Sequence, residues 1–272
     1  MIVGIRAHDL IKGSIDEVLS AAINNGFEAI QLVFKKALVN QPFNKENVDI
    51  VKESLSRHNI KIAMLGAYFN PVHSNKELVR NNIEYFKEHL RLACELNCKY
   101  VGTETGSYND DKWTYNPKNQ TEEGYLETMK VFHELAKVAK EYNTTILMEP
   151  AWGHVVYNVA TLKRAFDEIN SENFKVTIDI FNLIYLGNYK QYKEIFLDAL
   201  TTFKDDIKII HLKDFYVLDD KIVQCGLGKG IIDFKFVVNS IKQYCPNATM
   251  IFEGVIGDDI KTSKELIDSL NK

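Results

Sequence analysis

Residues 144–150 read Thr-Thr-Ile-Leu-Met-Glu-Pro, a short apolar run that ends in an acid and a proline. A run of this kind is typical of a strand buried on both faces, as in a parallel sheet. A carboxylate inside such a strand would be costly to bury, whereas at the C-terminal end of the strand it can face a cavity. Glu149 therefore marks both the end of a predicted strand and a candidate functional position.

Three further segments of the C-terminal half repeat this pattern. Residues 175–179, 207–211 and 249–253 are short, apolar and rich in β-branched side chains, and they end at Asp179, His211 and Glu253. The strand ends are about 30 to 42 residues apart, which leaves room for a strand, a loop and a covering helix. Three carboxylates and one imidazole at the ends of four neighbouring strands predict a divalent metal site.

The rest of the chain extends the same alternation. Residues 2–6, 28–32, 60–65 and 100–104 also read as strands, and amphipathic segments separate the eight predicted strands. Eight alternations in 272 residues, without a linker, predict a single (β/α)8, or TIM, barrel spanning 1–272. In such barrels, reactive groups gather at the C-terminal ends of the strands. A doubly wound open sheet would require a glycine-rich turn after the first strand, and residues 6–10 contain no glycine.

Polar residues predict where several helices and one turn lie. Ser14, Thr121 and Asp233 precede amphipathic segments and are expected to cap helices. Residues 215–224 read as a small hairpin that turns at Asp219-Asp220. The glycine-rich segment 226–230 is either a plain turn or a phosphate cradle built from backbone N–H groups.

Composition excludes several classes of function. The net charge is −4 and the pI is near 6.0, so we expect no nucleic acid partner. The chain has no run of 18 apolar residues, which argues against a membrane span. The N-terminal residues lack a basic segment followed by an apolar core, so a cytoplasmic protein is expected. The four cysteines form no CxxC pair and are predicted to be reduced, mostly buried thiols.

The donor set indicates which ion the site would bind. Three oxygen ligands and one imidazole favour one octahedral divalent cation such as Mn²⁺, Mg²⁺ or Co²⁺. Zn²⁺ stays open as an alternative, although structural zinc prefers cysteine and histidine. Four protein ligands would leave two positions of an octahedral ion for vicinal oxygens of a substrate.

At this point the residues resemble a known family. The sequence is similar to the xylose isomerase-like barrels, and within them to the sugar phosphate isomerase/epimerase branch. The resemblance covers essentially the full length and is carried by the segments Ile-Arg-Ala-His-Asp at 5–9, Gly-Thr-Glu-Thr-Gly at 102–106, Met-Glu-Pro at 148–150, Ile-Asp-Ile-Phe-Asn-Leu at 178–183, His-Leu-Lys-Asp-Phe at 211–215, Gly-Leu-Gly-Lys-Gly at 226–230 and Phe-Glu-Gly at 252–254.

The resemblance implies metal ligation by the four residues already selected, and proton transfer by Glu149 and Glu253 on either side of a sugar. It implies a small-molecule sugar or sugar phosphate as substrate and leaves open a homodimer or homotetramer. Three positions depart from the family pattern. Asn182 stands where many relatives place a substrate-binding histidine, and Lys213 stands where some epimerases use an arginine. Ala151 stands where many relatives have a histidine two residues after the fifth-strand glutamate, and the nearest histidine here is His154. The identity of the substrate is therefore not given by the resemblance.

A divalent ion that binds a carbonyl oxygen and the neighbouring hydroxyl acidifies the C–H between them by stabilising an enediolate. A nearby carboxylate takes the proton, and an acid returns it. Return to the neighbouring carbon gives isomerisation, return to the opposite face gives epimerisation, and loss of a β-hydroxyl gives dehydration by a lyase. The sequence does not separate these three reactions.

Residues outside the ligand set are candidates for contact with substrate. These candidates are His8, Asn70, His73, Glu104, His154, Asn182 and Lys213. Hydrogen bonding within loops is the alternative for Asn70, His73 and His154, and pairing with Asp214 is the alternative for Lys213. Trp113 and Trp152 either form a wall of the pocket or pack near the barrel mouth.

Two rival functions differ in class. An abasic-site endonuclease-like hydrolase shares this barrel but would need more histidines at strand ends and a basic groove. The chain has seven histidines and a negative net charge, which disfavours that hydrolase. A barrel without activity that serves as a sugar-binding subunit is the second rival. The unbroken ligand set argues against it, and Asn182 argues for it.

Overall fold

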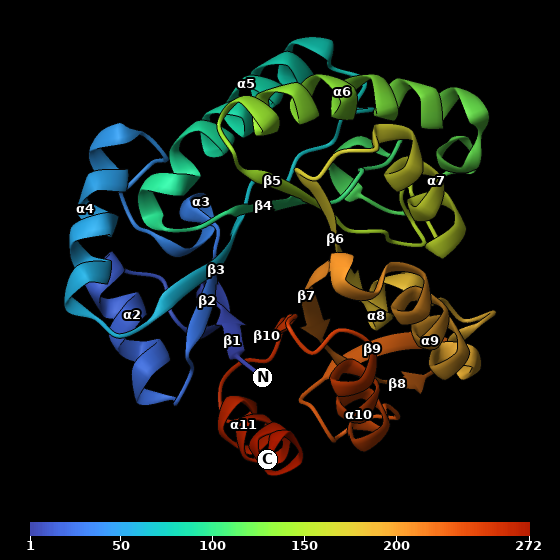
Figure 1. The fold of residues 1–272 in the computed structure, drawn as a ribbon. Coiled ribbons are helices and arrows are strands. Elements are labelled where there is room, and N and C mark those ends of the chain that lie inside the picture. The colour runs from blue at the N-terminus through green and yellow to red at the C-terminus, as the bar shows by residue number, and fades with distance from the viewer.

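Eight parallel strands close into a barrel in the computed structural model, which describes residues 1–272 (Figure 1). The barrel strands are β1 (Val3–Arg6), β2 (Ala29–Leu32), β3 (Lys61–Gly66), β4 (Tyr100–Thr103), β5 (Thr145–Met148), β6 (Phe174–Asp179), β7 (Ile207–Leu212) and β10 (Thr249–Phe252). Their order around the barrel is β1-β10-β7-β6-β5-β4-β3-β2, and neighbouring strands are parallel. The predicted TIM barrel is confirmed, and each of the eight predicted strands lies within two residues of its observed bounds.

A ring of eight longer helices covers the outside of the barrel (Figure 1). They are α2 (Ile15–Asn24), α4 (Lys45–Arg57), α5 (Lys76–Leu92), α6 (Glu122–Glu141), α7 (Val159–Ile169), α9 (Tyr192–Phe203), α10 (Phe234–Tyr244) and α11 (Asp259–Asn271). The predicted caps are present, since the side chains of Ser14, Thr121 and Asp233 accept hydrogen bonds from the first turns of α2, α6 and α10. No helix is both long enough and apolar enough to cross a membrane.

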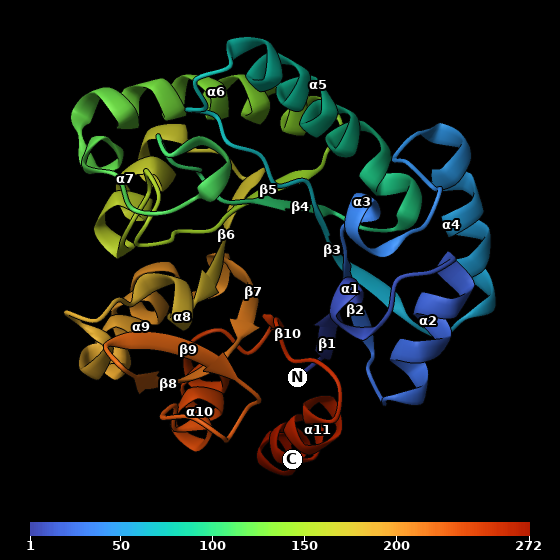
Figure 2. The same cartoon turned by 180° about the vertical axis from the view of Figure 1, so that it is seen from behind.

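Three one-turn helices follow strands directly, and the sequence analysis did not predict them. They are α1 (Ala7–Leu10), α3 (Phe34–Ala37) and α8 (Ile180–Leu183), and Figure 2 shows α1 beside β1 and β2. His8, a predicted substrate-contact residue, lies in α1, two residues after β1 ends at Arg6. Four-residue helices are too short to show a helical period in the sequence.

The predicted hairpin is confirmed at the end of β7. It consists of β8 (Asp214–Leu218) and β9 (Lys221–Cys225), which pair antiparallel. Asp219 and Asp220 form the turn with φ of 47° and 55°. Aspartate tolerates this left-handed region, and two successive positive φ angles suit the twist of a two-residue hairpin turn.

The core has two parts. A cluster of 72 buried residues fills the space between the strands and the surrounding helices, and a cluster of six buried residues brings together side chains of β2, β3, β5, β7 and β10. Gly4 pairs with both Ala29 and Ile251, and a Cβ on Gly4 would lie 2.5 Å from the carbonyl oxygen of Ala29. This smaller cluster closes the barrel interior below the strand ends, so polar side chains further along the strands have a packed floor.

Candidate metal centre

The alternation of side chains along a strand places the candidate ligands at the barrel mouth. Successive residues of a strand point to opposite faces. His211 and Glu253 come two residues after Ile209 and Ile251, which belong to the smaller core cluster, and Glu149 follows the buried strand β5 at once. Each polar group therefore shares the inward face of its strand and lies closer to the C-terminal end.

The four predicted ligands converge. Each of Glu149, Asp179, His211 and Glu253 offers one ligand atom, and these atoms all lie within 4.8 Å of one another. His211 Nδ1 lies 3.1 Å from Glu149 Oε1, 2.9 Å from Glu253 Oε2 and 4.0 Å from Asp179 Oδ2. The structure thus brings together side chains that are up to 104 residues apart in the chain.

The ring of His211 is oriented by a side chain from the opposite part of the barrel sheet. Its Nε2 lies 2.7 Å from Gln31 Oε1, and the Gln31 amide in turn donates to the Tyr68 hydroxyl at 2.8 Å. An amide oxygen only accepts, so Nε2 carries a proton, and Nδ1 is the ring nitrogen that faces the carboxylates. A hydrogen bond of this kind fixes the tautomer and direction of a metal-binding histidine.

Two cations neutralise part of the acidic cluster. Lys213 Nζ lies 2.9 Å from Asp179 Oδ2 and 2.9 Å from Glu253 Oε1, and Arg6 Nη1 lies 2.6 Å from Glu253 Oε1. Although burial opposes it, the carboxylates of Asp179 and Glu253 raise the pKa of Lys213 above its ordinary value. Lys213 therefore pairs inside the barrel and does not pair with Asp214.

Protonation of the cluster follows from the same charges. Burial alone would lower the pKa of His211, but the carboxylates of Glu149 and Glu253 raise it to about 10. Burial, and then the charge of Glu149, raise the pKa of Glu104 to about 8. In the metal-free chain an imidazolium and the Lys213 ammonium thus offset part of the charge of the three candidate carboxylate ligands.

Asn182 links two acids at the mouth. Its Nδ2 donates to Glu149 Oε1 at 2.7 Å and to Glu104 Oε1 at 3.2 Å, while its Oδ1 accepts from Lys213 Nζ at 3.2 Å. The amide can serve both carboxylates and the ammonium because it has donors and an acceptor. Asn182 therefore positions Glu149, Glu104 and Lys213 relative to one another.

The donor set fits a divalent ion. Asp179 Oδ2 and Glu253 Oε2 are buried and accept no well-aligned hydrogen bond, although Lys213 and His211 approach them to 2.9 Å. Buried carboxylate oxygens without aligned donors are uncommon, and they are typical of sites that bind an ion or a water. Together with His211 Nδ1 they belong to the group of ligand atoms that lie within 4.8 Å of one another, so these side chains could bind a metal.

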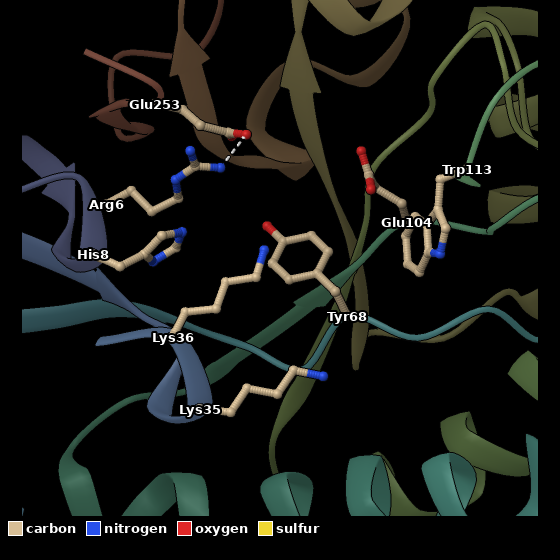
Figure 3. Close-up of a pocket in the computed structure, with 8 residues that line it drawn as sticks. All are labelled: Arg6, His8, Lys35, Lys36, Tyr68, Glu104, Trp113 and Glu253. Atoms are coloured by element: carbon tan, nitrogen blue, oxygen red, sulfur yellow. Dashed lines mark hydrogen bonds and ion pairs between the residues drawn. The ribbon is translucent and has the colours of Figure 1, made fainter. Parts of the chain in front are cut away.

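A cavity of about 230 Å³ opens beside Glu253 at the barrel mouth (Figure 3). Eight residues line it, namely Arg6, His8, Lys35, Lys36, Tyr68, Glu104, Trp113 and Glu253. His8 Nδ1 is buried without a hydrogen-bond partner. Burial, and then the charge of Arg6, lower the pKa of His8 to about 4, so a neutral ring faces the cavity. Two of the predicted substrate-contact residues, His8 and Glu104, therefore share a cavity with a candidate ligand.

Three other predicted substrate-contact residues do not line this cavity. Asn70 Nδ2 donates to the carbonyls of Ser107 and Asp110, and His73 Nδ1 accepts from the Asn75 backbone N–H. His154 Nε2 lies 3.2 Å from the carbonyl of Trp113, which itself lines the cavity. These contacts match the alternative of loop hydrogen bonding, and a direct substrate contact by the three residues stays a prediction.

The glycine-rich segment after the hairpin is already bound to an internal anion. Asp214 is fully buried, and its carboxylate accepts hydrogen bonds from the backbone N–H groups of Gly228 and Gly230 at 2.9 and 2.8 Å. The N–H groups of Phe215 and Ile232 donate to the other oxygen. The amides that would bind a phosphate are thus occupied, and the segment is a turn.

The sequence did not single out four residues that line the cavity or contact a candidate ligand, namely Arg6, Gln31, Lys35 and Lys36. Arg6 lies at the C-terminal end of β1, as the candidate ligands lie at or next to the ends of their strands, and Gln31 is the single polar residue of the buried strand β2, so both had a detectable signal. Lys35 and Lys36 follow β2 in α3, where two exposed lysines resemble ordinary surface residues. Their position on the cavity depends on α3, which has no sequence signature.

The family follows from a direct comparison. Residues 19–272 match the family model described as "Xylose isomerase-like TIM barrel". The match covers most of the chain, so the protein belongs to this family. No curated protein matches its sequence.

Solved structures share the fold across the whole chain. A "D-tagatose 3-epimerase-like protein" has a TM-score of 0.77 at 19% identity, with 99% of this chain and 97% of that chain covered. A probable 3-DHS dehydratase from Bacillus anthracis has a TM-score of 0.77 at 15% identity, covering 100% and 99%. A protein described with a bound zinc atom has a TM-score of 0.74 at 18% identity, covering 99% and 96%. At these identities the likeness establishes the fold alone.

Proposed function

We propose that this chain is a divalent-metal-dependent isomerase or epimerase of a sugar or sugar phosphate. The observation that carries the proposal is the cluster of Glu149, Asp179, His211 and Glu253, whose ligand atoms lie within 4.8 Å of one another at the barrel mouth. Its oxygen-rich donor set suits Mn²⁺, Mg²⁺ or Co²⁺, and Zn²⁺ is the alternative. Membership of the xylose isomerase-like family and an epimerase-like neighbour support sugar chemistry.

The bound ion would supply the electrophile that acidifies a C–H next to a carbonyl. Side chains of the protein would carry out the proton transfer itself. Around the barrel Glu149 and Glu253 come from β5 and β10, with β6 and β7 between them, so they are the outer two of the four ligands. Each can take or return a proton from its own side of a substrate carbon. Glu149 Oε1 is engaged by Asn182, which leaves Oε2 to act on the proton.

Lys213 and the cavity walls complete the arrangement. Lys213 Nζ provides a fixed positive charge beside Asp179 and Glu253, where negative charge on a substrate oxygen would be stabilised. Tyr68 and Trp113 form the non-charged part of the cavity lining. They restrict water near the reacting carbon, which strengthens the electrostatic interactions there.

The test combines metal analysis with solvent exchange. We expect about one divalent ion per chain, and deuterium from solvent in the product of any sugar that the protein converts. Glu149→Gln and Glu253→Gln should retain measurable metal but lose at least roughly 100-fold of the exchange rate, since glutamine cannot accept the proton. Wild-type exchange in both variants would contradict the assignment of these two residues as proton carriers.

Dehydration is the second candidate function, and the probable dehydratase among the structural neighbours favours it. The same carboxylates would remove the proton, and a β-hydroxyl would then leave as water. A product that lacks the elements of water, detected by mass spectrometry, would identify this outcome. An isomerase or epimerase gives a product of unchanged mass.

A further inference from the structure

The cavity beside Glu253 has a second charged end that the proposed chemistry does not use. In Figure 3, Lys35 and Lys36 lie at the end opposite Glu253, with Arg6 and His8 between them. Both lysines come from α3, the single turn that follows β2. A substrate whose reacting carbon lies near Glu253 would therefore direct its far end towards two ammonium groups.

The backbone of α3 is fixed, so the position of the two lysines is defined. Phe34 and Ala37, which flank them, are fully buried. The N–H groups of Lys36 and Ala37 donate to the Val33 carbonyl at 2.9 Å. A bridge between Gly13 and Leu38 ties the end of the turn to the segment before α2. The lysines project from an anchored turn, which makes them suitable for binding rather than for general solubility alone.

The charges of Lys35 and Lys36 are not neutralised within the protein. Neither lysine has a carboxylate oxygen within the 4.0 Å of an ion pair, whereas Arg6 pairs with Asp9 at 2.8 Å and with Glu253 at 2.6 Å. Aromatic rings are their neighbours instead, since the Lys35 ammonium lies 5.9 Å from the Tyr85 ring and the Lys36 ammonium lies 5.9 Å from the Tyr68 ring. A ring orients an ammonium without cancelling its charge.

Like charges at this end raise the local positive potential. Although the Lys35 side chain is exposed as a whole, its ammonium is partly desolvated at the cavity edge. This desolvation, and then the charge of Lys36, lower the pKa of Lys35. An anion bound between the two groups would relieve that repulsion and form charge-assisted hydrogen bonds.

The other end of the cavity does not supply a compensating negative charge when an ion is bound. A divalent ion together with Lys213 would balance the three carboxylates of the cluster, and Asp9 balances Arg6. Glu104 is the other acid in the cavity lining, and its pKa, raised to about 8, leaves it mostly protonated and neutral at pH 7. The cavity is therefore polarised, with its excess positive charge at α3.

Resting on the function proposed above, we infer that the substrate carries an anionic group at the end remote from its reacting carbon, and that Lys35 and Lys36 bind this group. A phosphate ester and a carboxylate share the required chemistry, since both offer several oxygens to lysine ammonium groups. The cavity of about 230 Å³ lies below the roughly 300–1,000 Å³ of drug-sized sites, which suits a single small sugar derivative.

The experiment compares three ligands that differ only at one terminal carbon. D-Fructose is neutral, D-fructuronate carries a carboxylate, and D-fructose 6-phosphate carries a phosphate. Calorimetric titration into the Mn²⁺-loaded full chain should show at least one anionic ligand binding roughly 10- to 100-fold more tightly than fructose. Tightening by the phosphate alone identifies a phosphate ester, and tightening by fructuronate identifies a carboxylate.

The variant K35M/K36M should abolish this preference, so that neither anionic ligand binds more tightly than fructose. The matched control is K137M/K140M, which removes the same charge from two exposed lysines of α6 without ion pairs. Equal wild-type affinity for all three ligands, or the same affinities in K35M/K36M as in the control, would overturn the inference.

Failure of this inference and failure of the proposed function give different results. Inorganic phosphate titrated into EDTA-treated protein tests the lysines without any metal or reaction. Phosphate binding that depends on Lys35 and Lys36, without solvent exchange in any sugar, would support the anion site and contradict the proposed isomerase or epimerase activity. Solvent exchange in neutral fructose, without tighter binding of either anionic analogue, would support the proposed activity and contradict the anion site.

Discussion

At the scale of single residues, the direction of the His211 lone pair depends on an amide in another strand. Gln31 Oε1 accepts from His211 Nε2 at 2.7 Å. We expect Gln31→Leu to lower the affinity for Mn²⁺ by roughly 10- to 100-fold, as loss of such outer hydrogen bonds typically does. Metal titration followed by electron paramagnetic resonance of free Mn²⁺ measures the effect.

Two variants control this prediction. Gln31→Glu keeps an accepting oxygen for the imidazole and should bind Mn²⁺ with near wild-type affinity. Tyr68→Phe removes only the hydroxyl to which Gln31 donates, so its loss should be smaller than that of Gln31→Leu. Wild-type affinity in Gln31→Leu would show that the histidine is oriented without the amide.

The four candidate ligands could be predicted from sequence because each one interrupts a buried strand at its end. The residues that orient and neutralise them could not be predicted in the same way. Gln31 contacts His211 across 180 residues, and Arg6 contacts Glu253 across 247. Such pairings depend on how the barrel closes, and no local period in the sequence encodes them.

At the scale of elements, a buried aspartate joins the hairpin to the turn before α10. Asp214 accepts four backbone hydrogen bonds, from Phe215, Gly228, Gly230 and Ile232. Asp214→Ala would leave these N–H groups without an acceptor, at roughly 1–3 kcal/mol for each group that stays buried. We expect the free energy of unfolding, measured in urea, to fall by at least about 3 kcal/mol.

The control for Asp214→Ala lies at the tip of the same hairpin. Asp219 is exposed and has a φ of 47°, a conformation that asparagine also tolerates. Asp219→Asn should therefore change the free energy of unfolding by less than about 0.5 kcal/mol. A loss in Asp214→Ala no larger than in this control would mean that water replaces the carboxylate at little cost.

The longer elements could be predicted and the shortest ones could not. Strands β5, β6, β7 and β10 and the capped helices α2, α6 and α10 carry apolar periods and polar caps that are visible in the sequence. One-turn helices such as α1 and α3 contain four residues each and have no period to detect. They nevertheless place His8, Lys35 and Lys36 on the cavity, and of these three residues the sequence indicated only His8 as a candidate for substrate contact.

At the scale of the whole molecule, the candidate ligands belong to β5, β6, β7 and β10, which form one continuous half of the barrel. An ion bound to all four would stabilise the folded chain over the unfolded one. At a free concentration of 100 times the dissociation constant this stabilisation is about 2.7 kcal/mol. For a chain of this size the corresponding rise in melting temperature is roughly 5–10 °C, and His211→Ala should lose most of it.

The pH dependence of this effect has a definite sign. In the metal-free fold the pKa of His211 is raised to about 10, against 6.5 for an ordinary histidine. The ion pairs of the imidazolium therefore stabilise the metal-free fold fully below pH 6.5, and this contribution is lost as the pH rises towards 10. The ion must displace that proton, so its affinity should rise roughly tenfold per pH unit across this range. Scanning calorimetry at pH 6, 7 and 8, with a fixed concentration of free Mn²⁺, should show a metal-induced rise in melting temperature that grows with pH. A rise that is equal at the three pH values, or largest at pH 6, would exclude His211 as a ligand.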